Sequence, residues 1–492
     1  MREVELGWGK VLLVKDNGEF HALGHKCPHY GAPLVKGVLS RGRVRCPWHG
    51  ACFNIGTGDL EDFPGLDTPS CLPLSGHPQA LQLQRRTKVM AKCISPSAGH
   101  SSSTNVLIVG AGAAGLVCAE TLRQEGFSDR IVLCTLDRHL PYDRPKLSKS
   151  LDAQPEQLAL RPKEFFRAYG IEVLTEAQVV TVDVRNKKVV FKDGFKLEYS
   201  KLLLAPGSSP KTLSCKGKEV ENVFTIRTPE DANRVVRLAR GRNAVVVGAG
   251  FLGMEVAAYL TEKAHSVSVV ELEETPFRRF LGERVGRALM KMFENNRVKF
   301  YMQTEVSELR AQEGKVGPAS CPPLSGSGAG ELGLPPHPPL PTAEGGRAEE
   351  QQEPWVLSPQ MMQTNVPGVF AAGDAVTFPL AWRNNRKVNI PHWQMAHAQG
   401  RVAAQNMLAQ EAEISTVPYL WTAMFGKSLR YAGYGEGFDD VIIQGDLEDL
   451  KFVAFYTKGD EVIAVASMNY DPIVSKVAEV LASGRAIRKR EV

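Results

Sequence analysis

The sequence lacks several features that would place it in common protein classes. Its nine cysteines include no C-x-x-C pair, so a thioredoxin-reductase-like redox disulfide is unsupported. No stretch approaches the roughly 20 apolar residues that are needed to span a bilayer. The net charge of +5 over 492 residues is too small to indicate nucleic acid or a membrane surface as a partner. Residues 1–5 bring acidic side chains at once and do not resemble a signal or transit peptide.

The bulk composition describes an ordinary globular protein. A length of 492 residues predicts about three domains. Apolar residues make up 43% and charged residues 23% of the chain, which is typical of globular domains. Six scattered cysteines are interpreted as reduced thiols of an intracellular protein: Cys71, Cys93, Cys118, Cys134, Cys215 and Cys321.

Two short loops near the N-terminus combine cysteine with histidine. They read C-P-H at residues 27–29 and C-P-W-H at residues 46–49. Two Cys and two His are the ligand set of a Rieske [2Fe–2S] centre, although a structural zinc site also takes these residue types from two loops. We therefore predict four metal ligands: Cys27, His29, Cys46 and His49.

The residues after each loop favour iron over zinc. G-A-P-L at 31–34 and G-A-C-F at 50–53 resemble the two cluster-binding boxes of Rieske ferredoxins. High-potential members carry an extra Cys in each loop, joined as a disulfide, and the first loop here has none. The resemblance therefore implies a potential at the low end of the Rieske range, about −150 mV. Cys52 is interpreted as a small buried residue rather than a third thiolate ligand.

From residue 105 the pattern changes to strands alternating with helices, which is typical of doubly wound sheets. An apolar run at 106–109 enters G-A-G-A-A-G at 110–115. Glycines at this spacing allow a tight turn, close approach to a pyrophosphate and helix–strand packing. We expect this segment to bind a dinucleotide through Gly110, Ala111, Gly112, Ala113, Ala114 and Gly115. Asp137, which follows the second strand at 131–133, is assigned to the ribose.

A second copy of the motif lies at 248–253, with the sequence G-A-G-F-L-G. We expect it to bind a second dinucleotide through Gly248, Gly250 and Gly253. Its second strand ends at Glu271, whose carboxylate would accept hydrogen bonds from a ribose 2′-hydroxyl and repel a 2′-phosphate. This predicts NAD(H) rather than NADP(H). For each copy the alternative is a glycine-rich turn that binds nothing.

A third signal lies far downstream, at residues 364–374. Its sequence, T-N-V-P-G-V-F-A-A-G-D, resembles the second flavin motif of two-dinucleotide-domain flavoproteins. The resemblance implies that Asp374 holds the ribityl hydroxyls of FAD. Because this motif follows the second glycine-rich turn, it also implies that an inserted NAD domain splits the FAD domain.

Together these motifs resemble the family of FAD-dependent, NADH-oxidising ferredoxin reductases that includes apoptosis-inducing factor. Within that family the chain is similar to the members with an N-terminal Rieske module. P-Y-D-R-P-K-L-S-K at 141–149 matches a segment that contacts the flavin nucleotide, which implies this role for Arg144 and Lys149. Two cations beside a pyrophosphate make physical sense, and solvated loop charges are the alternative.

The resemblance implies further roles around the flavin. Gly207, in L-A-P-G-S at 204–208, would bring backbone close to FAD, and Val179 would contact the adenine. Trp393 would lie against the isoalloxazine, with core packing as its alternative. Glu255 would lie near the nicotinamide or flavin and pair with Lys149. We place Lys149, Glu255 and Trp393 at the reaction centre.

The expected fold class is multidomain, with a small all-β module, two Rossmann-like α/β domains and an α+β C-terminal domain. The expected order is a Rieske [2Fe–2S] domain at 1–80, a linker at 81–104, an FAD domain at 105–240 and 357–415, an NAD domain at 241–356, and a C-terminal interface domain at 416–492 with a final helix near 473–481.

Two segments depart from the family pattern. Residues 314–356 contain nine Pro and eight Gly, so we expect a disordered loop where the family has its last NAD-domain strand. Residues 68–76 are not expected to supply the pair of strands that closes the Rieske barrel. Our hypothesis is that both segments reflect alternative splicing or an error in the gene model.

The implied activity is electron transfer between NAD(H), FAD and a Rieske cluster, with an unidentified final acceptor. No nucleic acid and no transmembrane segment are expected. The resemblance implies an apoptosis-related role and a mitochondrial location, with the cytoplasm as the alternative, and it suggests a homodimer. A pro-apoptotic interaction protein with weak or lost redox activity stays open. A Rieske oxygenase would need a 2-His-1-carboxylate iron site, which we do not find.

Overall fold

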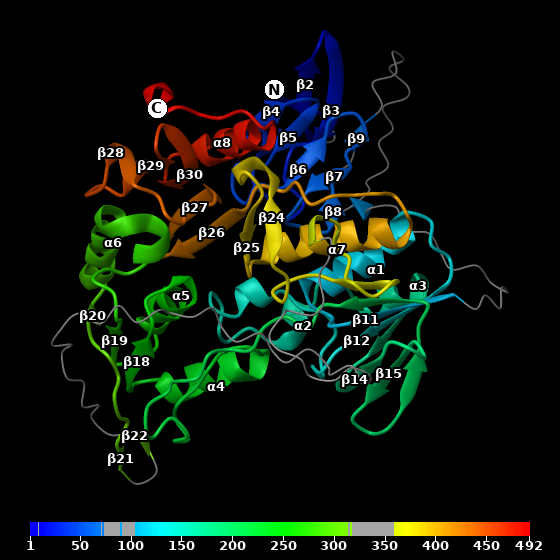
Figure 1. The fold of residues 1–492 in the computed structure, drawn as a ribbon. Helices are drawn as coiled ribbons and strands as arrows, with labels where there is room; N and C mark the ends of the chain where they lie inside the picture. Colours follow the sequence, from blue (N-terminus) through cyan, green and yellow to red (C-terminus); the bar gives the residue numbers. More distant parts are fainter. Residues whose placement is uncertain (8, 70, 73–88, 91–103, 313–314, 317–358) are drawn as a thin grey trace.

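The structure is a computed structural model that describes residues 1–7, 9–69, 71–72, 89–90, 104–312, 315–316 and 359–492. The Pro/Gly segment expected to be disordered, 314–356, lies outside the described residues except for 315–316. The described chain forms an N-terminal all-β module, two α/β domains and a C-terminal domain with a five-stranded sheet (Figure 1).

The N-terminal module is built from short antiparallel strands. One sheet contains β1 (Arg2–Leu6), β2 (Gly9–Asp16), β3 (Glu19–Gly24) and β9 (Cys71–Leu72). A second contains β4 (Val38–Ser40), β5 (Arg43–Arg45), β6 (Cys52–Asn54) and β7 (Leu60–Asp62). The third is a pair, β8 (Asp67–Thr68) and β10 (Val89–Met90).

The expectation that residues 68–76 supply no strands was wrong. β9 pairs with the outer edge of β3, and β8 pairs with β10, which lies inside the segment expected to be a linker. β8, β9 and β10 are each only two residues long, so none of them shows an alternation of apolar and polar residues in the sequence. β9 forms because the edge of a sheet leaves backbone groups that a short extended segment can pair, whereas β8 and β10 pair only with each other.

The first α/β domain has a parallel sheet in the order β13-β12-β11-β17-β23. Its strands are β11 (Asn105–Val109), β12 (Arg130–Cys134), β13 (Ile171–Leu174), β17 (Lys201–Leu204) and β23 (Val369–Ala371). Alternate side chains point to opposite faces. One face packs on α1 (Ala113–Gln124) and α7 (Trp393–Met407). The other packs on an antiparallel sheet of β14 (Val179–Asp183), β15 (Lys188–Phe191) and β16 (Lys196–Glu198).

The chain leaves this domain after β17 and returns at β23, as predicted from the order of the motifs. Two short helices, α2 (Pro155–Leu158) and α3 (Lys163–Ala168), lie earlier, between β12 and β13, whereas α4 (Pro229–Ala239) follows β17. On the return, a hairpin of β24 (Phe378–Leu380) and β25 (Arg386–Val388) leads into α7.

The inserted α/β domain has a parallel sheet in the order β18-β19-β20. Its elements are β18 (Asn243–Val247), α5 (Phe251–Leu260), β19 (Ser266–Val270), α6 (Arg278–Asn295), β20 (Val298–Tyr301) and a hairpin of β21 (Ala311–Gln312) and β22 (Lys315–Val316). Within the described residues, β18 pairs with β19 alone.

The C-terminal domain is an antiparallel sheet in the order β26-β27-β30-β29-β28 with one α-helix. The strands are β26 (Tyr419–Met424), β27 (Lys427–Gly433), β28 (Asp440–Asp446), β29 (Lys451–Lys458) and β30 (Glu461–Met468). The final helix predicted near 473–481 is α8 (Ile473–Ala482), whose apolar side packs on the sheet.

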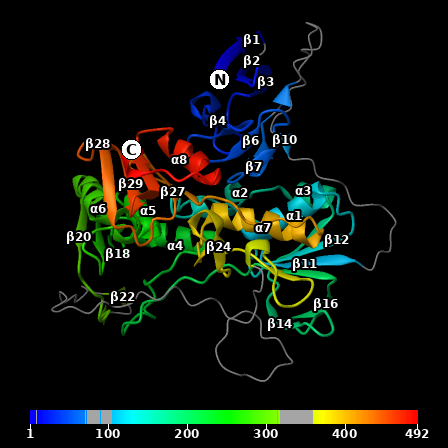
Figure 2. The ribbon, with the colours of Figure 1, turned by 45° about the horizontal axis from the view of Figure 1, so that its top comes forward.

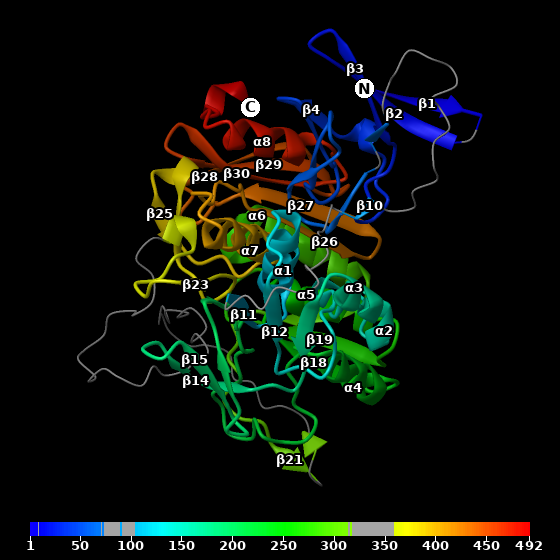
Figure 3. The ribbon, with the colours of Figure 1, turned by 90° about the vertical axis from the view of Figure 1, so that its right-hand side faces the viewer.

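The N-terminal module lies against both α1/α7 and α8 in two further views (Figures 2 and 3). One apolar core runs without interruption from Leu12, Phe53 and Phe63 of this module to Val117 of α1 and Val402 of α7. The module is therefore packed onto the α/β domain through side chains rather than joined to it by the backbone alone.

Candidate functional site

A cavity of about 330 Å³ lies where both α/β domains meet the start of β26. We call it the central cavity. It brings together nine of the predicted residues: Gly112, Ala113, Ala114, Arg144, Lys149, Gly207, Glu255, Asp374 and Trp393. These residues come from six separate stretches of the sequence, so their meeting in one cavity is a property of the fold.

The glycine-rich turn after β11 forms one wall. Gly110 has φ +107°, and a Cβ there would lie 1.9 Å from the carbonyl oxygen of Ala205, so only glycine fits. At Gly112, by contrast, a Cβ would meet no atom of the described residues within 4 Å. This open space lies at the N-terminus of α1, where backbone N–H groups favour a phosphate.

Arg144 is held at the cavity by two acceptors. Its Nη2 donates to Oδ2 of Asp137 at 2.9 Å, and its Nη1 donates to the carbonyl oxygen of Arg227 at 2.7 Å. Tyr142 Oη also donates to Oδ2 of Asp137, at 2.9 Å. Asp137 itself does not line the cavity, and neither does Val179, the first residue of β14. Both remain predictions as nucleotide contacts.

The expected pair of Lys149 and Glu255 is present, with 2.8 Å between Nζ and Oε1. Glu255 is 7% exposed and also accepts hydrogen bonds from Ser148 Oγ and, at 2.6 Å, from Thr422 Oγ1. Glu255 therefore fixes Lys149 and joins three parts of the chain at the cavity.

Asp374 follows β23 and faces the cavity from the opposite side. Its Oδ2 accepts a hydrogen bond from Ser208 Oγ at 2.7 Å. Its carbonyl oxygen accepts another from Asn389 Nδ2 at 2.8 Å. One carboxylate oxygen, Oδ1, is not used in these contacts, so the side chain has capacity for a ligand hydroxyl.

The second glycine-rich turn repeats the internal packing of the first. A Cβ at Gly253 would lie 2.0 Å from the carbonyl oxygen of Gly248, and at Gly250 it would meet no described atom within 4 Å. Glu271 comes directly after β19, and its Oε2 accepts from the backbone N–H of Ala249 at 2.5 Å. The carboxylate is thus aimed at the turn, where the ribose was predicted.

The four predicted metal ligands form two pairs. The Nδ1 atoms of His29 and His49 face each other at 3.2 Å. Cys27 and Cys46 are buried at the starts of matching turns, because each backbone N–H donates to the carbonyl oxygen five residues later. Two thiols on one side and two imidazoles on the other suit a cluster that takes two protein ligands on each iron.

The imidazoles are neutral, as metal ligation requires. Burial, with Lys146 nearby, lowers the pKa of His29 to about 3. Burial, with His29, Arg430 and Lys149 nearby, lowers the pKa of His49 to about 2. Among the described residues no three His, Cys, Asp or Glu side chains gather around one point as a single-ion site. The donor set fits a two-iron cluster.

One side chain that the sequence did not single out lies between the two sites. The ring of Trp421, on β26, is centred 4.8 Å from that of His49, 6.0 Å from that of His29 and 5.4 Å from that of His392. Trp421 and His392 both line the central cavity. Trp421 stands in no recognisable motif, so only the fold reveals its position.

His392 lies at the start of α7 and lines the central cavity. It is the N-cap of α7, where its Nδ1 accepts from the N–H of Gln394. Burial, together with Lys149, lowers the pKa of His392 to about 4. It therefore forms a neutral part of the cavity wall.

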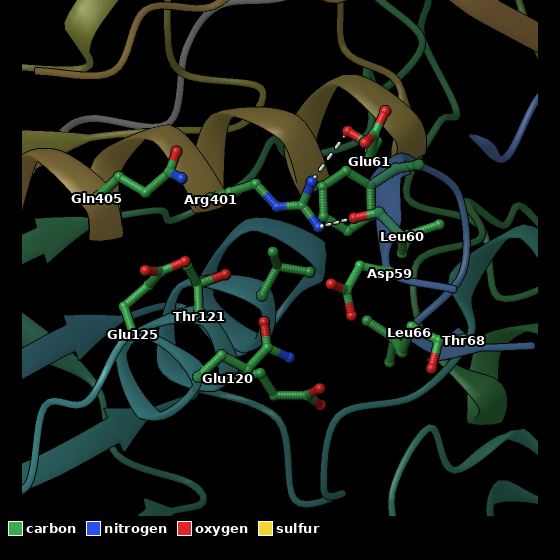
Figure 4. A pocket seen from close by; sticks show the side chains of 13 residues that line it. Asp59, Leu60, Glu61, Leu66, Thr68, Glu120, Thr121, Glu125, Arg401 and Gln405 are labelled. Atoms are coloured by element: carbon green, nitrogen blue, oxygen red, sulfur yellow. Dashed lines mark hydrogen bonds between the residues drawn. The ribbon is translucent and has the colours of Figure 1, made fainter. Parts of the chain in front are cut away.

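A second cavity, of about 430 Å³, lies between the N-terminal module and α1/α7 (Figure 4). Its rim carries Asp59, Glu61 and Glu125, so we call it the acidic cavity. Figure 4 shows Arg401 of α7 reaching across it, donating to the carbonyl oxygens of Glu61 at 3.0 Å and Leu60 at 2.9 Å. Its contacts join two domains.

Three known domain families match the chain. They are the Rieske [2Fe-2S] domain at residues 1–78, pyridine nucleotide-disulphide oxidoreductase at 104–321, and the reductase C-terminal domain at 419–492. Two relatives named apoptosis-inducing factor 3, from Mus musculus and Homo sapiens, are each 86% identical to it. Their alignments, over 503 and 519 residues, cover 100% of this chain and 83% of each relative. This chain belongs to the apoptosis-inducing factor 3 family.

Solved structures agree with this assignment. The covalent putidaredoxin reductase–putidaredoxin complex matches with a TM-score of 0.70 and 26% identity, covering 79% of this chain and 95% of the solved one. This member of the apoptosis-inducing factor 3 family is an FAD-dependent NAD(H) oxidoreductase of the ferredoxin-reductase type. Its cofactors are FAD, NAD(H) and a [2Fe–2S] cluster, and the predicted fold class is confirmed. Among the described helices, none has the length and apolar character to cross a bilayer.

Proposed function

We propose that electrons pass within this one chain between NAD(H), FAD and the Rieske cluster. The observation that carries the proposal is the position of Trp421, which contacts both predicted cluster histidines and lines the central cavity. When bound, FAD exchanges a hydride with the nicotinamide and gives up electrons singly. The residues need only bind, orient and shield these groups.

In this proposal the central cavity binds FAD through groups of complementary charge and through backbone that can approach the cofactor closely. Gly112 at the N-terminus of α1 and the Arg144 guanidinium receive the pyrophosphate. Asp374 accepts from the ribityl hydroxyls and Gly207 lets the backbone approach. Trp393, which lines the cavity, packs against the isoalloxazine. Asp137 and Val179 belong to the adenosine end.

The nicotinamide nucleotide enters over the second glycine-rich turn. Gly250 gives its pyrophosphate room, and Glu271 accepts from the ribose 2′-hydroxyl and selects NADH against NADPH. Glu255 of α5 lines the central cavity and holds Lys149 at 2.8 Å. Glu255 and Lys149 would therefore lie where the nicotinamide end meets the flavin.

In the proposed electron path, one aromatic side chain, that of Trp421, separates the central cavity from the cluster histidines. His49 and Trp421 rings are 4.8 Å apart between centroids, so the imidazole edge of the cluster site lies against the indole and no other residue need intervene. His29, His49 and Trp421 are each partly buried at this contact. The proposed role of Trp421 is to fill the space between the central cavity and the cluster histidines with a polarizable side chain rather than with solvent.

Anaerobic mixing of the reconstituted protein with NADH tests this order. We expect the flavin absorbance to bleach first and the EPR signal of the reduced Rieske cluster to follow. A Trp421→Ala variant should slow only the second phase, and Trp421→Phe, which keeps an aromatic ring, should slow it less. A cluster that stays oxidised while the flavin bleaches would contradict the proposal.

One observation favours a second candidate, an interaction protein with weak or lost redox activity. In the described part of the NAD domain, β18 has a neighbour on one edge only, so the nicotinamide side is less supported than the flavin side. If this function is the main one, dithionite will bleach the flavin and NADH will not. Peptide mass spectrometry of the natural protein will show whether the segment 314–356 is present.

Mitochondrial location and an apoptosis-related role are proposed from the names of the relatives alone. Fractionation of cells that express the tagged full-length protein tests the location. A homodimer through the C-terminal domain is a further proposal, tested by sedimentation velocity over a range of concentrations.

A further inference from the structure

The C-terminal domain contacts the second cluster-binding loop of the Rieske module, residues 46–53. Ser475 Oγ on α8 donates to the carbonyl oxygen of Cys46 at 3.0 Å. Arg430 Nε on β27 donates to the carbonyl oxygen of Trp48 at 2.8 Å. The Tyr419 ring lies so close to Gly50 that a Cβ there would be 2.6 Å from it. The loop is thus shaped partly by residues more than 350 positions away.

An ion cluster beside this loop is centred on Glu479 of α8. Its Oε1 accepts from Arg45 Nε at 2.5 Å, and its Oε2 accepts from Arg43 Nη2 at 3.1 Å and Arg41 Nη2 at 3.2 Å. The side chains of Arg45 and Glu479 are only 1% and 4% exposed. All three arginines belong to the Rieske module, so one carboxylate of the reductase holds three cations of the module.

Arg45 transmits this contact to the cluster loop. Its Nη1 donates to the carbonyl oxygen of Gly50 at 2.8 Å and to Oδ2 of Asp62 at 3.0 Å. Burial alone would raise the pKa of Glu479, but Arg45, Arg43 and Arg41 outweigh it and lower the pKa to about 2. The carboxylate is therefore ionised, and removing it would leave a buried guanidinium without its main partner.

The opposite side of the module is held by the FAD domain. Tyr30 Oη, next to His29, donates to Oδ2 of Asp143 at 2.9 Å. Arg161 donates to Oδ1 of Asp67 at 2.7 Å, and Arg401 donates across the acidic cavity (Figure 4). Contacts on two sides and a shared apolar core hold the module in place, and the Glu479 cluster acts on the 46–53 loop through Arg45.

We propose that Glu479 is a positioning residue for electron transfer between the flavin and the Rieske cluster. By fixing Arg45 and hence the 46–53 loop, it holds His49 against Trp421. The surface around Trp421 is thereby reserved for the chain's own Rieske module rather than a separate ferredoxin. This inference rests on the proposed internal electron path.

The test compares Glu479→Gln with Asp449→Asn, which removes one carboxylate from an exposed turn of the same domain. In the reconstituted full chain, both variants should retain iron content, Rieske g values and the rate of flavin reduction by NADH. Only Glu479→Gln should slow cluster reduction, by several-fold, because the rate of electron transfer falls as the distance between flavin and cluster grows. Pulsed EPR should show a broader flavin-to-cluster distance distribution in this variant alone.

The outcomes separate the two proposals. If NADH never reduces the cluster of the unaltered protein, the internal path is wrong. If it does, and Glu479→Gln reduces its cluster at the unaltered rate with the same distance distribution, the positioning role is overturned. Should Glu479→Gln fail to fold, Arg43→Gln removes a contact at a side chain that is 19% exposed. It should give a smaller slowing of cluster reduction alone, and an unaltered rate would overturn the role.

Discussion

The two dinucleotide-binding domains begin with the same strand–turn–helix unit but place it in different surroundings. In the FAD domain β11 has β12 on one edge and β17 on the other. In the NAD domain β18 has only β19, as far as the chain is described. Leu107 of β11 is fully buried, whereas Val245, at the same distance before its glycine turn, is 55% exposed.

The difference extends to the glycines. A Cβ at Gly110 would run into the Ala205 carbonyl that follows β17, while at the equivalent Gly248 it would meet no described atom within 4 Å. The contact that makes Gly110 indispensable thus comes from a neighbouring strand and not from the motif. Two glycine-rich turns of the same sequence type therefore tolerate substitution differently. Matched substitutions at equivalent positions of the two domains measure this difference.

The largest effect is expected for Gly110→Ala against Gly248→Ala. Both glycines have positive φ, +107° and +101°, so each substitution introduces strain of about 1–3 kcal/mol. Gly110→Ala adds a backbone clash and should lose the bound flavin or fail to fold. Flavin content and thermal unfolding measure the contrast. Equal losses in the two variants would show that β18 has a close neighbour after all.

Leu107→Ala against Val245→Ala comes next. Truncating fully buried Leu107 should lower the free energy of unfolding by about 2–5 kcal/mol. Truncating Val245 should change it by less than about 0.5 kcal/mol, as at other exposed sites. Chemical denaturation of the FAD-loaded protein gives both values. A large effect at Val245 would mean that its face of the sheet is covered.

The smallest effect is expected for Glu271→Ala, which acts on binding only. Loss of one charged hydrogen bond to the ribose, about 1.5 kcal/mol, corresponds to roughly a tenfold higher KM for NADH. The kcat should be unchanged, and discrimination against NADPH should fall. Asp137→Ala, the matched change in the FAD domain, should not change the KM for NADH. Steady-state kinetics with both nucleotides decide this, and an unaltered KM in Glu271→Ala would argue against the ribose contact.

Local patterns predicted most of the site, because each motif carries its own geometry. The paired Cys and His and both glycine-rich turns follow from residue type and spacing, whereas the Lys149–Glu255 pair was implied by the family resemblance. Trp421 and the strands β8 to β10 did not, since a lone aromatic and two-residue strands have no periodicity. The Arg45–Glu479 pair joins residues 434 positions apart, and nothing in either neighbourhood points to the other.

The shared apolar core between the Rieske module and helices α1 and α7 has a consequence for how the protein comes apart. Phe63 packs over His397 of α7 with 5.1 Å between ring centroids, so separating the two would bare aromatic surface on each. The iron-bearing and flavin-bearing parts should therefore melt together in a single calorimetric transition. Cutting the chain between them would yield two aggregation-prone fragments instead of a functional ferredoxin and a functional reductase.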